Sequence, residues 1–323
     1  MSQNPLEIQT FDNVPPLDDQ FGVDPKTTAP DALYDSLFGQ AEDQPPRQTY
    51  ALLDAAKITM LPDMLEQSDL HYRCLFKGKA FDDLKTAAPW IVKLEDGNSF
   101  TRNLFTYDAD NPAPWYLWDK NPGIYIRSTA SLDDLWAHFR KFTKTHDGRD
   151  KWYYLRLYDP PVLKYYLEGI QASAERLADL FHLRSGVRID ALIATNAAEK
   201  TAHVFRFNPD AESTSQPVVE LDIRYTEGVL REAIALLRNH TPELNHIPDD
   251  DLLWTARQHT NDFHRFDLQT KPVIANAIAI VALTGHPLTD LPPQDQHSLT
   301  DSNQSQFKRT TALLNRIKDR MTA

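Results

Sequence analysis

The stretch WYYLRLYDPPVL, residues 152–163, indicates how the chain is organised. Aromatic and branched residues from Trp152 to Tyr158 favour a half-buried strand. Asp159 then supplies a short carboxylate that can cap a helix, and the two prolines after it suit a first helical turn. Apolar residues recur at helical spacing from Val162 onward. We therefore predict a strand that passes directly into a helix.

Arg156 and Asp159 are the charged side chains of this apolar stretch. They could form a catalytic or ligand-binding pair, because functional side chains gather where strands end at the carboxyl edge of a sheet. They could instead be structural, because buried charges are normally paired with one another. We favour the structural interpretation, in which Arg156, Tyr158, Asp159 and Pro160 fix the junction between strand and helix.

The composition is that of a globular protein with a substantial core: of 323 residues, 41% are hydrophobic and 25% are charged. A chain of this length commonly forms two domains. The 46 acidic residues outnumber the 34 lysines and arginines, which gives a net charge of −12. Because an acidic surface repels phosphate groups, we expect neither nucleic acid nor an anionic membrane as a partner.

Three further features bear on the compartment. Cys74 is the only cysteine, so we expect no disulfide and no thiolate metal cluster. The longest apolar run, residues 273–283, is too short for a membrane span. The N-terminal residues lack the basic start and the apolar stretch of a signal peptide. We therefore expect a cytoplasmic protein.

Three regions of the chain differ in composition. Residues 1–47 combine acidic residues with prolines, so we expect a mostly flexible leader with one short helix near residues 31–38. Residues 48–224 alternate short apolar runs with helical patterns, which predicts an α/β domain with a layered mixed sheet and flanking helices. Residues 225–323 predict a smaller, mainly helical lobe, with a polar linker over residues 292–305.

An aromatic segment interrupts the α/β region. Residues 111–123 place Trp115, Tyr116 and Trp118 between prolines. In a loop stiffened by proline, such aromatics could form a recognition surface, since Trp and Tyr dominate the energetics of protein interfaces. They could equally anchor the loop onto the core. The sequence leaves both interpretations open, and these three residues are our candidate partner-binding site.

The histidines do not indicate a metal site. Two ligands on one helix face need a spacing of about three or four residues. His138 and His146 are eight residues apart, and His259 and His264 are five apart. We interpret His138 and His146 as surface residues. The sequence also lacks a nucleophile elbow, a phosphate loop and a dinucleotide fingerprint, so we predict no metal, no cofactor and no catalytic residue.

Five stretches are informative as a set: YALLDAA at 50–56, CLFKG at 74–78, APWIV at 88–92, GIYIRS at 123–128 and LRLYDP at 155–160. In this order they resemble the effector-adaptor chaperone domain of bacterial type VI secretion systems, known as Tap or TEC, over about residues 48–170. Residues 267–285 are similar, more loosely, to the helical lobe of that family. Two positions depart from it: Pro161 stands where the family usually has Arg, and Leu157 where Phe is more usual.

The resemblance implies a cytoplasmic adaptor and not an enzyme. Such a protein binds a cognate toxic effector and helps to mount it on the VgrG spike or its PAAR tip. An acidic body would suit a basic segment of the effector, through steering more than through affinity.

Two other functional classes stay open. One is an enzyme that uses Arg156, Asp159 and Asp54 at the edge of the sheet, and the other is an immunity protein that blocks a toxin with its acidic surface.

Overall fold

Short apolar runs supply the strands of a sheet in the first two thirds of the chain. The computed structural model describes residues 4–42, 44–146, 152–171, 173–211, 227–301 and 303–322. Within these residues, seven strands form one sheet, in the order β1 (Leu6–Phe11), β9 (Thr201–Phe207), β8 (Ile189–Asn196), β5 (Gly123–Ser128), β2 (Gln48–Asp54), β4 (Pro89–Leu94) and β3 (Tyr72–Cys74). Neighbouring strands in this order all pair antiparallel.

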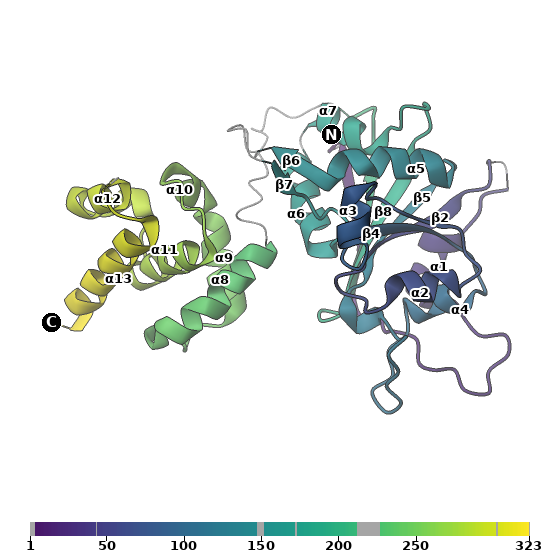
Figure 1. The fold of residues 1–323 in the computed structure, drawn as a ribbon, viewed down its shortest axis with the longest axis horizontal. Coiled ribbons are helices and arrows are strands. Elements are labelled where there is room, and N and C mark those ends of the chain that lie inside the picture. The colour runs from purple at the N-terminus through teal and green to yellow at the C-terminus, as the bar shows by residue number, and fades with distance from the viewer. Residues whose placement is uncertain are drawn as a thin grey trace. The chain divides into compact units, whose positions relative to one another are not determined.

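Helices lie in the connections between these strands (Figure 1). They are α1 (Asp31–Phe38), α2 (Leu61–Glu66), α3 (Lys79–Leu84), α4 (Ser99–Asn103), α5 (Leu132–Phe139), α6 (Pro160–Ile170) and α7 (Ala174–Phe181). β5 is buried at every position and β2 at every position after the first, as expected for continuous apolar runs. The predicted α/β class is confirmed, but the sheet is antiparallel where a mixed one was expected. The strands joined through α1, α2 and α4 run in the same direction, yet in the sheet each such pair is separated by at least one strand that runs the other way.

The leader is part of the fold, so the expectation that it is mostly flexible is wrong for the stretches described next. β1 pairs with β9 from Leu6↔Phe207 to Phe11↔Ala202. The predicted short helix is present as α1, and Leu33 and Leu37 on it are fully buried in the core of the sheet domain. The acidic, proline-rich composition conceals this, because the stability of β1 comes from a partner strand far away in sequence.

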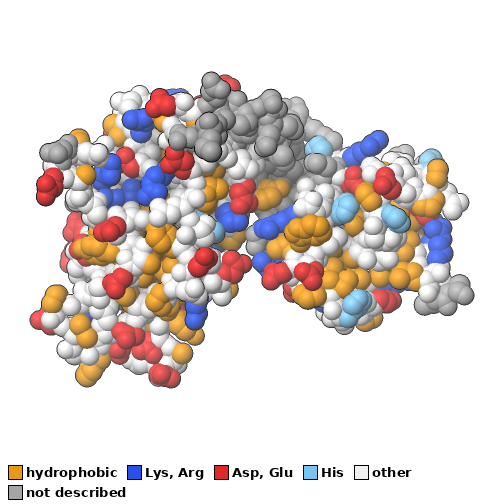
Figure 2. Space-filling model, turned by 180° about the vertical axis from the view of Figure 1, so that it is seen from behind, with side chains coloured by type: hydrophobic (Ala, Val, Ile, Leu, Met, Phe, Trp, Pro, Cys, Tyr) orange, Lys and Arg blue, Asp and Glu red, His pale blue; other side chains and the backbone are white. Residues whose placement is uncertain are grey.

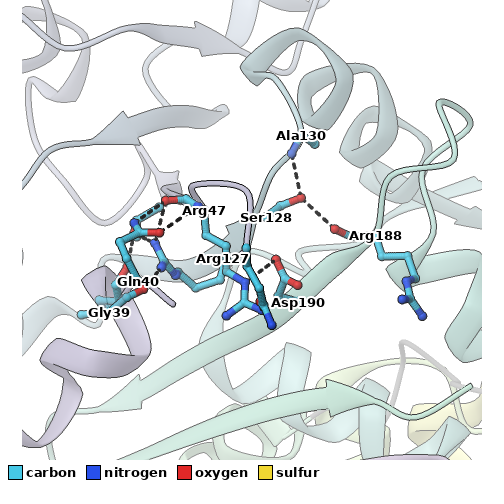
Figure 3. Close-up of polar contacts among 11 residues, drawn as sticks. Gly39, Gln40, Arg47, Arg127, Ser128, Ala130, Arg188 and Asp190 are labelled. Carbon is cyan, nitrogen blue, oxygen red and sulfur yellow. Dashed lines mark hydrogen bonds and ion pairs between the residues drawn. The ribbon is translucent and has the colours of Figure 1, made fainter. Parts of the chain in front are cut away.

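Arg127 fastens the end of the leader to the sheet (Figure 3). Its buried guanidinium donates to the Gly39 carbonyl, to the Arg47 carbonyl at 3.3 Å and to Thr49 Oγ1 at 2.9 Å. Gln40 closes the same turn, since its amide donates to the Arg47 carbonyl and accepts from the Arg47 backbone N–H. Arg127 therefore fills a structural role: together with Gln40, it supplies hydrogen bonds to backbone carbonyl groups where the leader meets the sheet.

The predicted strand from Trp152 to Tyr158 is wrong in its extent. β7 covers only Trp152–Tyr154 and pairs with β6 (Lys144–His146) in a separate two-stranded ribbon. The following residues form a turn, in which the Asp159 N–H donates to the Arg156 carbonyl at 2.9 Å. Leu155 and Leu157 are buried beside the exposed Arg156, and this alternation imitates a strand. α6 does begin at Pro160, as predicted.

The chain divides into two units by its internal contacts, residues 1–220 and 221–323, and the second is helical. Its helices are α8 (Glu227–His240), α9 (Asp249–Gln258), α10 (Thr260–Arg265), α11 (Lys271–Thr284), α12 (Pro293–Thr300) and α13 (Gln306–Thr322). α11 is buried over most of its length and is followed by Gly285, whose φ of 67° is strained for other residues. Among the described residues, no helix is both long enough and apolar enough to cross a membrane.

The predicted polar linker at 292–305 is wrong, because it contains α12. Asp295 on this helix is buried, with 1% of its side chain exposed. Arg320 donates to its Oδ2 at 2.7 Å and Arg316 to its Oδ1 at 3.2 Å, both from α13. Two arginines thus neutralise one buried carboxylate and tie the last two helices together.

His138 is buried, so the expectation of a surface residue is wrong. Its Nε2 lies 2.7 Å from the Leu180 carbonyl, which joins α5 to α7. Because a carbonyl only accepts, Nε2 carries the proton of the neutral ring, and the buried Nδ1 has no hydrogen-bond partner among the described residues. Burial lowers the pKa of His138. The side chain of His146 lies outside the described residues.

This geometry predicts a stability that falls in mild acid. The pKa of His138 in the folded state is below that in the unfolded chain, which is about 6.5. The contribution of the neutral ring is therefore present above that value and is lost as the pH falls through it toward the folded-state pKa. Between pH 7.5 and 5.5, wild type should lose more unfolding free energy in urea than His138→Gln, which keeps a donor to the Leu180 carbonyl. Equal losses would contradict this account.

Candidate functional site

The aromatic segment contains two kinds of side chain. Trp118 is only 3% exposed and packs in the core of the sheet domain against Phe105, with ring centroids 6.5 Å apart. Trp115 is 51% exposed and lies edge-on to the half-buried Tyr116. Trp118 is therefore not available to a partner, and its assignment to a binding site is corrected. Trp115 and Tyr116 remain candidates.

Backbone hydrogen bonds explain this division. The Leu117 N–H donates to the Asn103 carbonyl at 2.9 Å, and the Trp118 N–H donates to the Thr106 carbonyl at 3.2 Å. These bonds hold the C-terminal part of the segment against the end of α4 and turn Leu117 and Trp118 inward. Trp115 precedes both anchors and stays outside. The loop is thus fastened on one side, and it presents aromatic rings on the other.

A second loop, from the leader, lies beside the first. Leu17 forms a β-bridge with Thr106, and Asn111 Nδ2 donates to Asp19 Oδ2 at 3.1 Å. This loop exposes Phe21, at 92%, and Val23 at its tip. Figure 1 shows both loops at the lower right, at the same end of the sheet domain. Sequence analysis missed Phe21 and Val23, although two apolar residues among aspartates and prolines were a usable signal.

The leader loop is held in shape by its own side chains. The Gln20 amide donates to the Thr27 carbonyl at 3.0 Å and accepts from the Thr27 N–H at 2.7 Å. Lys26 Nζ donates to the Asp19 carbonyl at 2.9 Å. Phe21 therefore extends from a braced turn, and a braced turn loses less conformational entropy than a free one when a partner covers it.

We call the following residues on the two loops the two-loop surface: the exposed Phe21, Val23, Tyr107 and Trp115, and the half-buried Tyr116. Six carboxylates belong to the same loops: Asp18, Asp19, Asp24, Asp108, Asp110 and Asp119. Hydrogen bonds from the Phe21 N–H and the Asn111 amide lower the pKa of Asp19, so it stays ionised. In Figure 2 this end of the domain, at the lower left, shows hydrophobic and acidic side chains intermixed.

A pocket of about 290 Å³ opens on the segment that carries Trp115. It is lined by Tyr107, Asp108, Pro112, Ala113, Pro114, Tyr116, Asp119 and Lys120. Its walls combine rings and prolines with two carboxylates. A pocket of this kind can receive one apolar or aliphatic-cationic side chain, such as the stem and charged head of Lys or Arg.

The structure also brings together the charged residues of the predicted junction. Asp54, at the end of β2, is 1% exposed and forms an ion pair with Arg156. Asp159 Oδ1 accepts from Lys57 Nζ at 2.8 Å, and Asp159 Oδ2 lies 3.7 Å from Arg156. Burial raises the pKa of Tyr158, which packs nearby, and the charge of Asp54 raises it further. Two carboxylates and two cations balance at the start of α6, where Pro160 occupies the first position.

The expected cap is absent, although Asp159 stands at the N-cap position. Its side chain forms no capping hydrogen bond to α6 and binds Lys57 instead. Asp54 is satisfied further by the Ala56 N–H, which donates to its Oδ1 at 3.0 Å. The two carboxylates therefore connect the end of β2 to the start of α6, which supports a structural interpretation of the junction.

A double-mutant cycle tests this connection. We expect the unfolding free energies of Lys57→Met and Asp159→Ala to be non-additive by about 0.5–1 kcal/mol, because each removes the same partly buried pair. Asp54→Asn should cost more, about 2 kcal/mol, since Asp54 is the buried carboxylate of the junction and its replacement leaves Arg156 with only the more distant Asp159. Strict additivity of the first two changes would show that the ion pair between Lys57 and Asp159 does not stabilise this connection.

The described residues hold no group of three or more His, Cys, Asp or Glu side chains that could bind a metal ion. Cys74 is buried, and burial raises the pKa of its thiol.

A family model described as "Domain of unknown function (DUF4123)" matches residues 49–177 of the chain. This range runs from β2 into α7, contains the five stretches YALLDAA to LRLYDP, and excludes the helical unit. No curated protein and no solved structure matches the chain.

Proposed function

We propose that the chain is a cytoplasmic adaptor that binds a toxic effector of a bacterial type VI secretion system. It would help to load this effector onto the VgrG spike or its PAAR tip, and it would act by binding and not by catalysis. The DUF4123 match supports this proposal, because it covers the same residues as the five stretches that resemble the adaptor domain of these systems.

The observation that carries the proposal is the two-loop surface. Monomeric proteins seldom leave large aromatic side chains exposed together on braced loops unless a partner covers them. Phe21 and Trp115 supply large apolar area, and aromatic residues of this type dominate binding hot spots. The carboxylates around them favour a partner segment with basic residues, which they attract before contact. We therefore infer that a basic, partly apolar segment of the effector binds here.

The alternative enzyme proposal places catalysis at Asp54, Arg156 and Asp159. These residues do lie together, as that alternative requires. However, each carboxylate has a cationic partner, and Lys57 and Arg156 link elements of the fold through them. This pairing favours a structural role, so the adaptor proposal assigns no chemistry to the junction.

Co-expression tests the proposal. Expressed with the effector encoded beside it, the chain should co-purify with that effector and raise its soluble yield. An immobilised spike protein should then retain the effector only when the chain is present. An immunity protein would bind and neutralise the toxin without linking it to the spike. Failure to bind either neighbouring protein would refute the adaptor proposal.

A further inference from the structure

A cluster of cations surrounds one tryptophan on another part of the sheet domain. The Arg73 guanidinium lies 3.5 Å from the centre of the Trp136 ring, Lys77 Nζ lies 4.2 Å from it and Arg140 lies 4.7 Å from it. Each can interact with the negative face of the ring, an interaction worth more when water is excluded. Trp136 itself is buried, so its ring is a fixed support for all three.

Hydrogen bonds hold this arrangement in place. The Trp136 indole N–H donates to the Cys74 carbonyl at 2.7 Å, and Arg140 Nε donates to the Leu75 carbonyl at 3.0 Å. The first bond joins α5 to the last residue of β3, and the second joins the residue just after α5 to the residue just after β3. The cluster is thus built from two elements locked to each other, and it does not depend on the chance positions of long side chains.

The β6–β7 ribbon extends the cluster. Lys144 Nζ lies 5.2 Å from the centre of the Tyr154 ring, and this ring contacts Phe76 with centroids 5.7 Å apart. Phe76 is the residue before Lys77 in the chain. We call the set Arg73, Phe76, Lys77, Trp136, Arg140, Lys144 and Tyr154 the basic aromatic patch.

Positive charge exceeds negative charge in the patch. Arg73 forms an ion pair with Asp133. Lys77, Arg140 and Lys144 form no ion pair with any carboxylate in the described part of the chain. In a protein with a net charge of −12, cations would be expected to find carboxylates readily. Cations held close together without anions repel one another, and an anionic partner relieves that repulsion.

We propose that the basic aromatic patch binds an acidic segment of a partner protein, with carboxylates on Lys77, Arg140 and Lys144 and an apolar side chain against Phe76 and Tyr154. The patch shares no residue with the two-loop surface and has the opposite charge. The inference stands on the patch alone and goes beyond the adaptor proposal. It gives the chain two surfaces that select partner segments of opposite charge.

A peptide fits this surface better than a nucleic acid. Asp82 and Asp83 on α3, and Asp133 and Asp134 on α5, are exposed on the elements that carry or flank the patch. A phosphate backbone longer than the patch would run past these carboxylates, and like charges closer than about 8 Å still repel at physiological salt. A short acidic segment places its charges on the lysines and ends before the carboxylates.

Fluorescence anisotropy with the full chain tests the proposal. The probe is a fluorescein-labelled peptide rich in Glu and Leu, and its control has Gln in place of every Glu. We expect binding of the Glu peptide only, weakened by added salt. Lys77→Glu combined with Lys144→Glu should weaken it about tenfold or more. Lys308→Glu, an exposed lysine of the helical unit, is the matched control and should leave it unchanged.

Several results would contradict the proposal, and one further variant tests it independently of the adaptor function. Equal binding of the Gln peptide, no binding of the Glu peptide, or binding that survives the double charge reversal in a variant with normal thermal stability would each overturn it. Tighter binding of single-stranded DNA, lost in the same variant, would overturn the choice of partner. Carbodiimide cross-linking should attach the Glu peptide at Lys77 or Lys144. The Phe21→Ala, Trp115→Ala double variant should still bind the peptide. A failure of the adaptor function can therefore be told apart from a failure of the basic aromatic patch to bind an acidic segment.

Discussion

Trp118→Ala should lower the free energy of unfolding by about 3–5 kcal/mol, whereas Trp115→Ala should change it by less than about 0.5 kcal/mol. The two tryptophans are three positions apart, but Trp118 is 3% exposed and Trp115 is 51% exposed. Removing Trp118 leaves a cavity beside Phe105, and the surrounding core can close it only in part. Removing Trp115 costs little stability, because more than half of the surface of this side chain is already exposed to water.

Urea denaturation of the two variants, followed by circular dichroism, measures this difference. The slope of unfolding free energy against urea should be the same for both, which excludes a change in the extent of unfolding. Similar losses for both tryptophans would mean that the whole segment is an anchor. In that case the two-loop surface would lose its main aromatic residue.

Phe21→Ala and Trp115→Ala should each weaken effector capture by about thirtyfold, equal to about 2 kcal/mol, with no loss of stability. Both side chains are exposed, so their removal affects partner contact and not the core. Isothermal titration calorimetry with the purified effector measures the affinity. Raising the salt concentration should weaken capture too, because the carboxylates of the two loops steer a basic segment.

Trp254→Ala is the matched control for these variants. Trp254 lies on α9 in the helical unit and is 65% exposed, so it resembles Trp115 in type and exposure. It should leave capture unchanged. If Trp254→Ala abolishes capture while Phe21→Ala and Trp115→Ala do not, the effector binds the helical unit, and the two-loop surface has another role.

The sequence was most informative where burial is continuous. The short apolar runs that predicted strands in the α/β region include residues 50–56, 89–94 and 123–128, which contribute to β2, β4 and β5, because a strand buried on both faces needs apolar residues at successive positions. The helical lobe at residues 225–323 was also predicted, and in α13 the apolar residues recur with helical spacing. In these elements the local pattern and the tertiary environment require the same residues.

The sequence failed where distant partners decide the conformation. β1 buries only Leu6 fully, so its composition resembles that of a flexible chain, and its pairing with β9 joins residues nearly 200 positions apart. Arg156 lies in a turn and not in a strand because Asp54, 102 positions away, binds it. Asp295 lies in a polar stretch of sequence that predicts a linker, but in the structure Arg316 and Arg320 bind it. Local propensity carries no information about such contacts.

For the same reason, only part of the candidate site could be predicted from the sequence. Trp115 and Tyr116 were recognised, but proline spacing could not separate them from Trp118, which is turned inward by hydrogen bonds to Asn103 and Thr106. Phe21 belongs to the site because Asp19 and Asn111 join two loops that are distant in sequence. A binding surface assembled from two loops is visible only once both loops are in place.

The most direct test of the adaptor function is a capture experiment with three purified proteins. The immobilised VgrG spike protein is incubated with the neighbouring effector, either alone, with wild-type chain, or with the Phe21→Ala, Trp115→Ala double variant. The adaptor account predicts effector retention with the wild-type chain, little without it, and little with the folded double variant. Retention that does not depend on the chain, or no retention with the wild type when both partners are folded, would contradict it.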